Sequence, residues 1–179
     1  TAEMCGMILA HFGLGVFVLG VLMVESIGIE KDVALRSGEE VEVRGYRFRF
    51  DGVARQQGPN YLADRGTVTV FDGDTQIAVL HPEKRGYASG GQIMTEAAID
   101  PGLTRDLYVA LGEPLGAEAW AVRVYVKPFI RCIWLGALLM MLGGFVAAAD
   151  RRFRRELAAD SEAADAPVSA AAAPVAATA

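Results

Sequence analysis

The residue of this chain best placed to do chemistry is His11, which lies inside an otherwise apolar run, residues 7–24 (MILAHFGLGVFVLGVLMV). If this run crosses a membrane as a helix, His11 lies about 10 Å from its start, because a helix rises about 1.5 Å per residue. An ionisable side chain at that depth is costly and commonly marks a functional site. The sequence therefore predicts that a partner holds this ring.

Two kinds of partner fit an imidazole at that depth. A neutral histidine can bind a metal through one ring nitrogen and donate a hydrogen bond from the other. Haem iron suits a membrane interior, because the porphyrin itself is apolar. The alternative is a structural hydrogen bond between helices, and the residues alone do not choose between the two. His11 supplies only one axial ligand, so a haem would need a second one from a helix outside this chain.

The glycines of the same run support a division of the helix into two faces. Gly15 follows His11 by one turn on the same face, where it would leave room for a flat macrocycle. Gly6, Gly13 and Gly20 repeat every seven residues on nearly the opposite face. Small residues at that spacing let two membrane helices approach closely. We therefore predict helix packing against the glycine repeat.

The other residues with reactive side chains form no recognisable site. His81 lies in LHPEKR, just after an apolar run, which predicts a surface turn. The chain has no CxxC and no metal-spaced histidine pair, which argues against structural zinc, and no CxxCH, so it is not itself a c-type cytochrome. Cys5 and Cys132 begin the two apolar runs, and antiparallel helices would place them about 30 Å apart. We expect no disulfide between them.

Two uncharged stretches, residues 4–24 and 132–149, are long enough to span about 30 Å of hydrocarbon. Together they account for much of the 53% hydrophobic content of the chain. The first has no basic flank before it and no A-x-A cleavage site after it, so its pattern is not that of a cleavable signal peptide. We therefore predict a multi-pass membrane protein with transmembrane helices at residues 4–26 and 129–149.

The charges that flank the second span predict the orientation. DRRFRR, residues 150–155, follows that span directly, and such arginine density marks a cytoplasmic end. Residues 150–179 are then a basic flank followed by a disordered Ala/Pro-rich cytoplasmic tail. The segment between the spans lies outside, in the periplasm of a Gram-negative bacterium. The net charge of −5 and the absence of a basic stripe elsewhere argue against nucleic acid as a partner.

Residues 30–128 have the alternating pattern of β-strands. Hairpins are predicted around Arg44-Gly45, around the Asp72-Gly73 turn, and within residues 106–128. About seven or eight strands at this spacing predict an all-β, mostly antiparallel domain, either a sandwich or a partly open barrel. Alternation predicts that these side chains contribute to its core: Phe48, Phe50, Val68, Val70, Trp120, Val122 and Val124. It places Arg47, Arg49 and Arg123 on a solvated face.

Several stretches resemble the C-terminal region of the CcmF/NrfE family of cytochrome c maturation haem lyase subunits. They are GMILAHFGLGVFVLGV (6–21), RGYRFRFDGV (44–53), QGPNY (57–61), LHPEKR (80–85), MTEAAIDPGLTRDLYVALGEPLG (94–116) and AVRVYVKPFIRCIWLGALL (121–139). The resemblance covers about residues 4–155.

This resemblance implies a function in the bacterial inner membrane. Family members join haem to the CxxCH cysteines of apocytochrome c in the periplasm, together with other cytochrome c maturation subunits. They also hold a b-type haem within the membrane between two histidines, and His11 matches one of these two. Because thioether formation needs reduced haem iron, such a haem would relay electrons to the substrate haem. Nothing in the family pattern assigns catalysis to His81.

The chain also departs from the family pattern. It lacks the tryptophan-rich periplasmic segment, the histidines that flank it, and the second ligand of the b haem. The resemblance therefore implies a C-terminal fragment that holds half of one haem site and the outer β-domain, without the haem-ligation site. The alternative is a stand-alone two-helix docking or assembly module with no haem, in which His11 is structural. A reading frame that continues upstream into further hydrophobic segments would favour the fragment.

Overall fold

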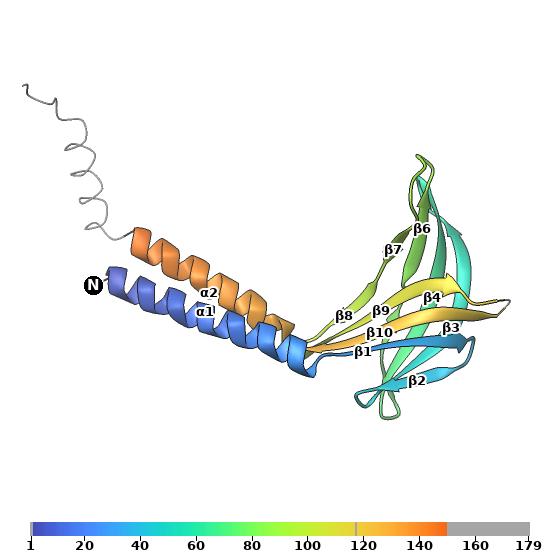
Figure 1. Ribbon diagram of the computed structural model, residues 1–179, viewed down its shortest axis with the longest axis horizontal. Helices are drawn as coiled ribbons and strands as arrows, with labels where there is room; N and C mark the ends of the chain where they lie inside the picture. The colour runs from blue at the N-terminus through green and yellow to red at the C-terminus, as the bar shows by residue number, and fades with distance from the viewer. Residues whose placement is uncertain (1, 117, 150–179) are drawn as a thin grey trace, which may run out of the picture. The chain divides into compact units, whose positions relative to one another are not determined.

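The computed structural model describes residues 2–116 and 118–149, and it consists of two helices that flank ten strands (Figure 1). Residues 150–179, where the arginine flank and the tail were predicted, lie outside the described residues. The elements are α1 (Ala2–Ile27), β1 (Ile29–Arg36), β2 (Glu40–Val43), β3 (Tyr46–Gln57), β4 (Tyr61–Asp72), β5 (Thr75–Leu80), β6 (Glu83–Tyr87), β7 (Met94–Glu96), β8 (Ala98–Pro101), β9 (Arg105–Pro114), β10 (Ala119–Pro128) and α2 (Ile130–Ala148).

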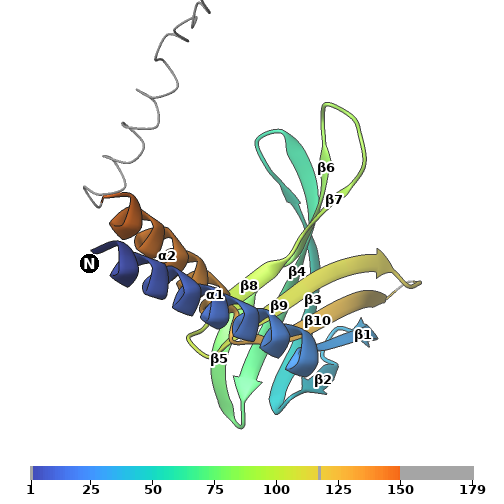
Figure 2. The ribbon, with the colours of Figure 1, turned by 60° about the vertical axis from the view of Figure 1, so that its left-hand side comes forward.

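The strands form two antiparallel sheets. The first has the order β1-β10-β9-β8, and the second has the order β2-β3-β4-β6-β7, with β5 paired to β4 beside β6. The long hairpin β3–β4 pairs from Tyr46↔Asp72 to Gln57↔Leu62. Figure 2 shows the far ends of this hairpin and of β6–β7 as two arms that extend beyond the other strands. The prediction of an all-β antiparallel domain between two apolar helices is confirmed.

One hydrophobic core lies between the two sheets, because alternate residues of the strands point inward. Phe48, Phe50, Val68 and Val70 enter it from one sheet, and they are at most 1% exposed. From the other sheet come Leu107, Val109, Leu111, Val122, Val124 and Val126. Of the seven predicted core residues, six are buried, while Trp120 is half-buried and packs against the core at its edge.

The hairpin turns follow the sequence signals. Arg44 and Gly45, with φ of 54° and 82°, connect β2 to β3, as a two-residue turn between twisted strands requires. Gly73 has φ of 58° in the turn between β4 and β5. All three predicted hairpins are present. Each turn sets the register of the two strands that it joins, and this register places the apolar side chains on the face toward the core.

The expected number of strands, about seven or eight, was too low, because the described residues contain ten. β6, β7 and β8 have only five, three and four residues, too few for a period-two pattern to stand out. β1 is an edge strand whose residues are mostly exposed, and it therefore carries charged side chains instead of an apolar alternation. Short strands and edge strands gain their structure from a neighbouring strand rather than from their own composition.

The two helices are long and apolar enough to span a membrane, with 26 residues in α1 and 19 residues in α2. Most of their large apolar side chains are exposed within the described chain. The chain forms two compact units, one made of the described residues up to Leu14 and from Leu138, the other of Gly15–Ala137. The second unit therefore contains the sandwich together with the adjoining halves of both helices.

Candidate functional site

His11 lies on α1 with its side chain exposed. Its Nδ1 is 2.8 Å from the carbonyl oxygen of Met7, one turn earlier in the same helix. A carbonyl oxygen only accepts hydrogen bonds, so Nδ1 carries the proton and donates it. The other ring nitrogen, Nε2, then has a lone pair, and no hydrogen bond within the described chain engages it. The ring is thus oriented by its own helix.

This arrangement is the one that a metal-binding histidine commonly has. The nitrogen that binds the metal is free, and the other one donates to a backbone carbonyl, which fixes both the tautomer and the ring orientation. Gly15 follows one turn later, and a Cβ added there would meet nothing within 4 Å. The residues present therefore fit one half of a haem site, with Nε2 as the ligand atom. The other histidine of the chain, His81, lies in the β-domain between β5 and β6, outside both helices. Among the described residues, no cluster of three or more His, Cys, Asp or Glu side chains occurs.

The predicted packing against the glycine repeat is present. Gly6, Gly13 and Gly20 are all buried. A Cβ at Gly6 would lie 2.5 Å from the amide nitrogen of Ala147 and 2.6 Å from the carbonyl oxygen of Gly143. A Cβ at Gly20 would lie 2.8 Å from the amide nitrogen of Ile133. Because glycine has no Cβ, α1 and α2 approach closely on this face.

His81 lies in the short connection between β5 and β6, and its side chain is exposed, as the sequence predicted. Its Nδ1 is 3.4 Å from the Thr67 hydroxyl, which is a weak contact between two surface side chains. No acid or thiol forms a hydrogen bond or ion pair with it in the described part of the chain. This geometry gives His81 no catalytic partner.

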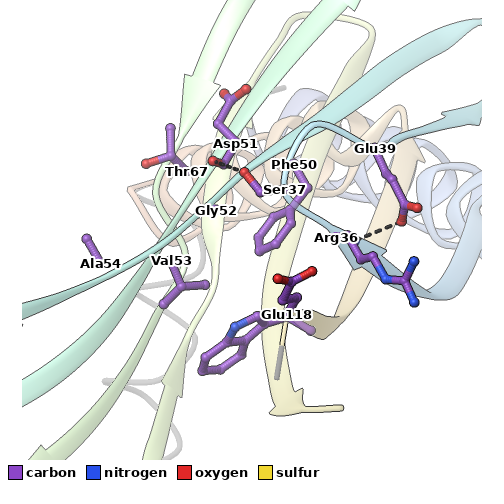
Figure 3. Close-up of a pocket in the computed structure, with 11 residues that line it drawn as sticks. Arg36, Ser37, Glu39, Phe50, Asp51, Gly52, Val53, Ala54, Thr67 and Glu118 are labelled. Atoms are coloured by element: carbon purple, nitrogen blue, oxygen red, sulfur yellow. Dashed lines mark hydrogen bonds between the residues drawn. The ribbon is translucent and has the colours of Figure 1, made fainter. Parts of the chain in front are cut away.

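A cleft with a volume of about 820 Å³ lies on the sandwich beside a β-bulge at Phe50–Gly52 (Figure 3). None of its lining residues is histidine or cysteine. Asp51 is fully engaged there: its carboxylate accepts hydrogen bonds from Arg49 (2.7 Å) and Thr69 (2.5 Å), and its backbone carbonyl accepts one from Ser37 (2.8 Å). These bonds stabilise the bulge and engage the Asp51 carboxylate. Two further carboxylates, Glu39 and Glu118, line the cleft, but no histidine or thiol lies beside them there.

Sequence reasoning did not identify this cleft. Asp51-Gly52 within an alternating run was a usable signal, because glycine inside a strand often marks a bulge. Gly52 has φ of 126°, a conformation that other residues rarely adopt. The cleft is polar and open, and the features that suggest chemistry in this chain remain those of His11.

The arginines predicted on a solvated face are ion-paired at the surface. Arg47 and Arg49 extend over the Phe71 ring and pair with Glu40, Asp74 and Asp51. Arg123 donates to both carboxylate oxygens of Asp32, at 2.5 and 2.9 Å. This hydrogen bonding lowers the pKa of Asp32 and raises the pKa of Arg123. These groups stabilise the outer surface and form no site for chemistry.

Comparison with known proteins identifies the sandwich. The family model described as the CcmF C-terminal beta-sandwich matches residues 26–128. The cytochrome c-type biogenesis protein CcmF of Pseudomonas fluorescens is 53% identical over 154 residues, which are 86% of this chain and 23% of that protein. The protein of the same name from Escherichia coli K12 is 45% identical over 157 residues, 88% of this chain and 24% of that protein.

A more distant relative and a solved structure are also similar to this chain. A protein of E. coli K12 named as a probable cytochrome c-type biogenesis protein NrfE is 34% identical over 140 residues, 78% of this chain and 25% of its own length. A solved structure titled Cytochrome c Heme Lyase CcmF is similar with a TM-score of 0.66, at 20% identity, over 81% of this chain and 24% of that one. At that identity the likeness concerns the fold alone. The chain spans about a quarter of the length of these relatives.

Proposed function

We propose a function for this chain from one premise, which is that it belongs to the CcmF C-terminal beta-sandwich family. Its curated relatives are named cytochrome c-type biogenesis proteins, and the similar solved structure is titled a haem lyase. These names support a general role in cytochrome c biogenesis. The resemblance inferred from the sequence is thereby confirmed at the level of the family.

The specific proposal is that this chain is the C-terminal part of a lyase that attaches haem to the CxxCH cysteines of apocytochrome c. In that protein His11 is one axial ligand of a b-type haem within the membrane, and the second ligand comes from a helix outside this chain. The partners are then apocytochrome c and other cytochrome c maturation subunits. The observation that carries this proposal is the oriented, exposed imidazole, with Nδ1 bonded to Met7 and Nε2 free.

Three residues of α1 would hold such a haem, each in a different way. His11 would bind the iron through Nε2, while the Met7 carbonyl holds the ring in one orientation. Gly15 leaves space on its side of α1 for a flat group. A haem held there would supply one-electron redox chemistry.

The test is to replace His11 with alanine in the complete protein. We expect the b-haem absorption spectrum to disappear and cytochrome c maturation to stop, because the iron loses one of its two axial bonds. Exogenous imidazole, able to occupy the vacated position, should restore part of both. His81→Ala is the matched control, and it should retain both the spectrum and maturation. If His11→Ala protein, made in normal amounts, keeps an unaltered haem spectrum, then His11 is structural.

We further propose that the chain resides in the bacterial inner membrane, with the sandwich in the periplasm and the C-terminus in the cytoplasm. The support is the arginine-rich flank after the second span, residues 150–155. Reporter fusions after Ala159 and within residues 55–60 should report opposite compartments, with the second outside. Activity of both reporters in one compartment would contradict this topology.

A further inference from the structure

The connection between β8 and β9 presents an exposed leucine. Leu103 is 88% exposed, more than any other large apolar side chain among the described residues. The loop that carries it, residues 102–104, is short, and it lies between a buried strand and the edge strand of one sheet. A single exposed leucine is ordinary on a protein surface. Its surroundings make this one informative.

The backbone on both sides of Leu103 is bound to the start of α2. The amide of Phe129, directly before α2, donates to the carbonyl oxygen of Thr104 at 2.9 Å. Nε of Arg131, in the first turn of α2, donates to the carbonyl oxygen of Gly102 at 3.1 Å. Leu103 is therefore presented by a fixed backbone rather than by a loose loop. Figure 1 shows the ends of β8 and β9 beside the base of the helices.

The length of α2 defines the height of this loop relative to a membrane. Its 19 residues extend about 28 Å, and the hydrocarbon core of a bilayer is about 30 Å thick. The whole helix is thus needed to cross, and its first turn must lie at the hydrocarbon boundary. Because Gly102 and Thr104 are hydrogen-bonded to residues 131 and 129, they lie at the same boundary.

We propose that the β8–β9 loop is a membrane anchor, which inserts the Leu103 side chain among lipid acyl chains at the surface that the sandwich faces. The exposed Arg131 lies beside it, at the level where arginine side chains reach phospholipid headgroups. Trp134, one turn further along α2 and 70% exposed, extends the same lipid-facing surface. The partner is therefore a lipid surface, continuous with the one that surrounds α2.

Such an anchor would give the sandwich a third attachment to the membrane, besides its connections to α1 and α2. Gly28 alone separates α1 from β1, and Phe129 alone separates β10 from α2. Leu103, away from both connections in the sequence, would prevent the sandwich from tilting about them. The proposal depends on the membrane spans, and it is independent of any haem.

The sequence provides a matched control for the test. Leu115 follows β9 just as Leu103 precedes it, and it is also exposed, at 51%. The ten residues of β9 separate the two positions by about 33 Å. In a background with Cys5→Ala and Cys132→Ala, the variants Leu103→Cys and Leu115→Cys each carry one nitroxide spin label. The full chain is studied in nanodiscs of phosphatidylcholine and phosphatidylglycerol.

The measurement compares collisions of each label with oxygen, which concentrates in lipid, and with a nickel chelate, which stays in water. We expect oxygen to dominate at position 103 and the chelate to dominate at position 115. Equal ratios at the two positions, with the chelate dominant, would place Leu103 in water and overturn the proposal. The same labels in the complete protein provide a second test, in which exclusion of both reagents from position 103 would show a protein contact and would also overturn it.

Discussion

The sandwich of this chain buries its large apolar side chains, whereas the two helices expose most of theirs. Phe48 and Phe50 in the sandwich are at most 1% exposed, whereas Phe12 in α1 and Phe145 in α2 are 62% and 67% exposed. Burial of apolar surface stabilises a fold in water, so the sandwich completes its own core within this chain. The helices expose such surface along most of their length, and they therefore need an apolar environment that residues 2–116 and 118–149 do not supply.

The largest expected contrast is between phenylalanines of the two regions. In a Trp134→Phe background, Trp120 is the sole tryptophan, and because it packs against the core its fluorescence reports unfolding of the sandwich. Phe48→Ala should lower the free energy of unfolding by about 3–5 kcal/mol, since it leaves a cavity between the two sheets. Phe12→Ala, measured in the same lipid nanodiscs with urea, should leave the midpoint nearly unchanged. Equal losses in the two variants would mean that the sandwich does not fold on its own core.

A smaller contrast is expected within the helix pair itself, at two adjacent glycines. A Cβ at Gly143 would lie 2.5 Å from the amide nitrogen of Ala10, whereas one at Gly144 would meet nothing within 4 Å. Gly143→Ala should destabilise the packed helices by about 1–3 kcal/mol, because backbone atoms must separate to admit the methyl group. Gly144→Ala should be neutral or slightly stabilising, because alanine favours helix over glycine.

The loss of helical circular dichroism on heating in detergent measures this difference. If Gly143→Ala melts at the same temperature as Gly144→Ala, then the close approach of the two helices does not contribute to stability. A lower melting temperature for Gly144→Ala alone would instead show that the open face of α2 is covered in solution.

Much of the fold was predictable, because the strongest signals were local. The sequence predicted two hairpins from alternation in residues 46–50 and 67–80 and from turns at Arg44-Gly45 and Asp72-Gly73. The structure contains both hairpins, with strands paired across these turns. The short strands β6, β7 and β8 were not predicted, since three to five residues carry too little pattern. The order of strands in the two sheets, and hence the position of β1 beside β10, depends on long-range pairing that no local pattern encodes.

The candidate site was predictable in part. His11 stood out because a polar ring in an apolar helix is rare, and the glycine repeat correctly indicated the packed face. Its role as a ligand stays a prediction. The bond from Nδ1 to Met7 and the exposed position of the ring depend on a side-chain rotamer and on where α2 packs, which the sequence did not specify. The same is true of Leu103, whose significance comes only from its hydrogen-bonded neighbours at the start of α2.

The smallest expected effect concerns the outer face of the sandwich, where burial contributes little. Asp32 and Arg123 lie directly opposite each other on β1 and β10, and Arg123 donates to both carboxylate oxygens. These hydrogen bonds lower the pKa of Asp32 from its ordinary value of 3.8. Because the folded-state pKa is below the unfolded one, the pair contributes stability above the unfolded value, and this contribution is lost as pH falls through the folded value.

Arg123→Gln should therefore return the pKa of Asp32 toward 3.8 and slightly lower the stability of the sandwich at neutral pH. Both side chains are about half exposed, so solvent and salt screen the pair and the loss should be small. Carbon-detected NMR of labelled aspartate follows the titration, and urea unfolding monitored by Trp120 follows stability. The difference in stability between wild type and variant should disappear in acid, because the protonated carboxyl no longer attracts the guanidinium. A difference that stays constant down to low pH would assign the effect to packing of the arginine stem across β1 rather than to its charge.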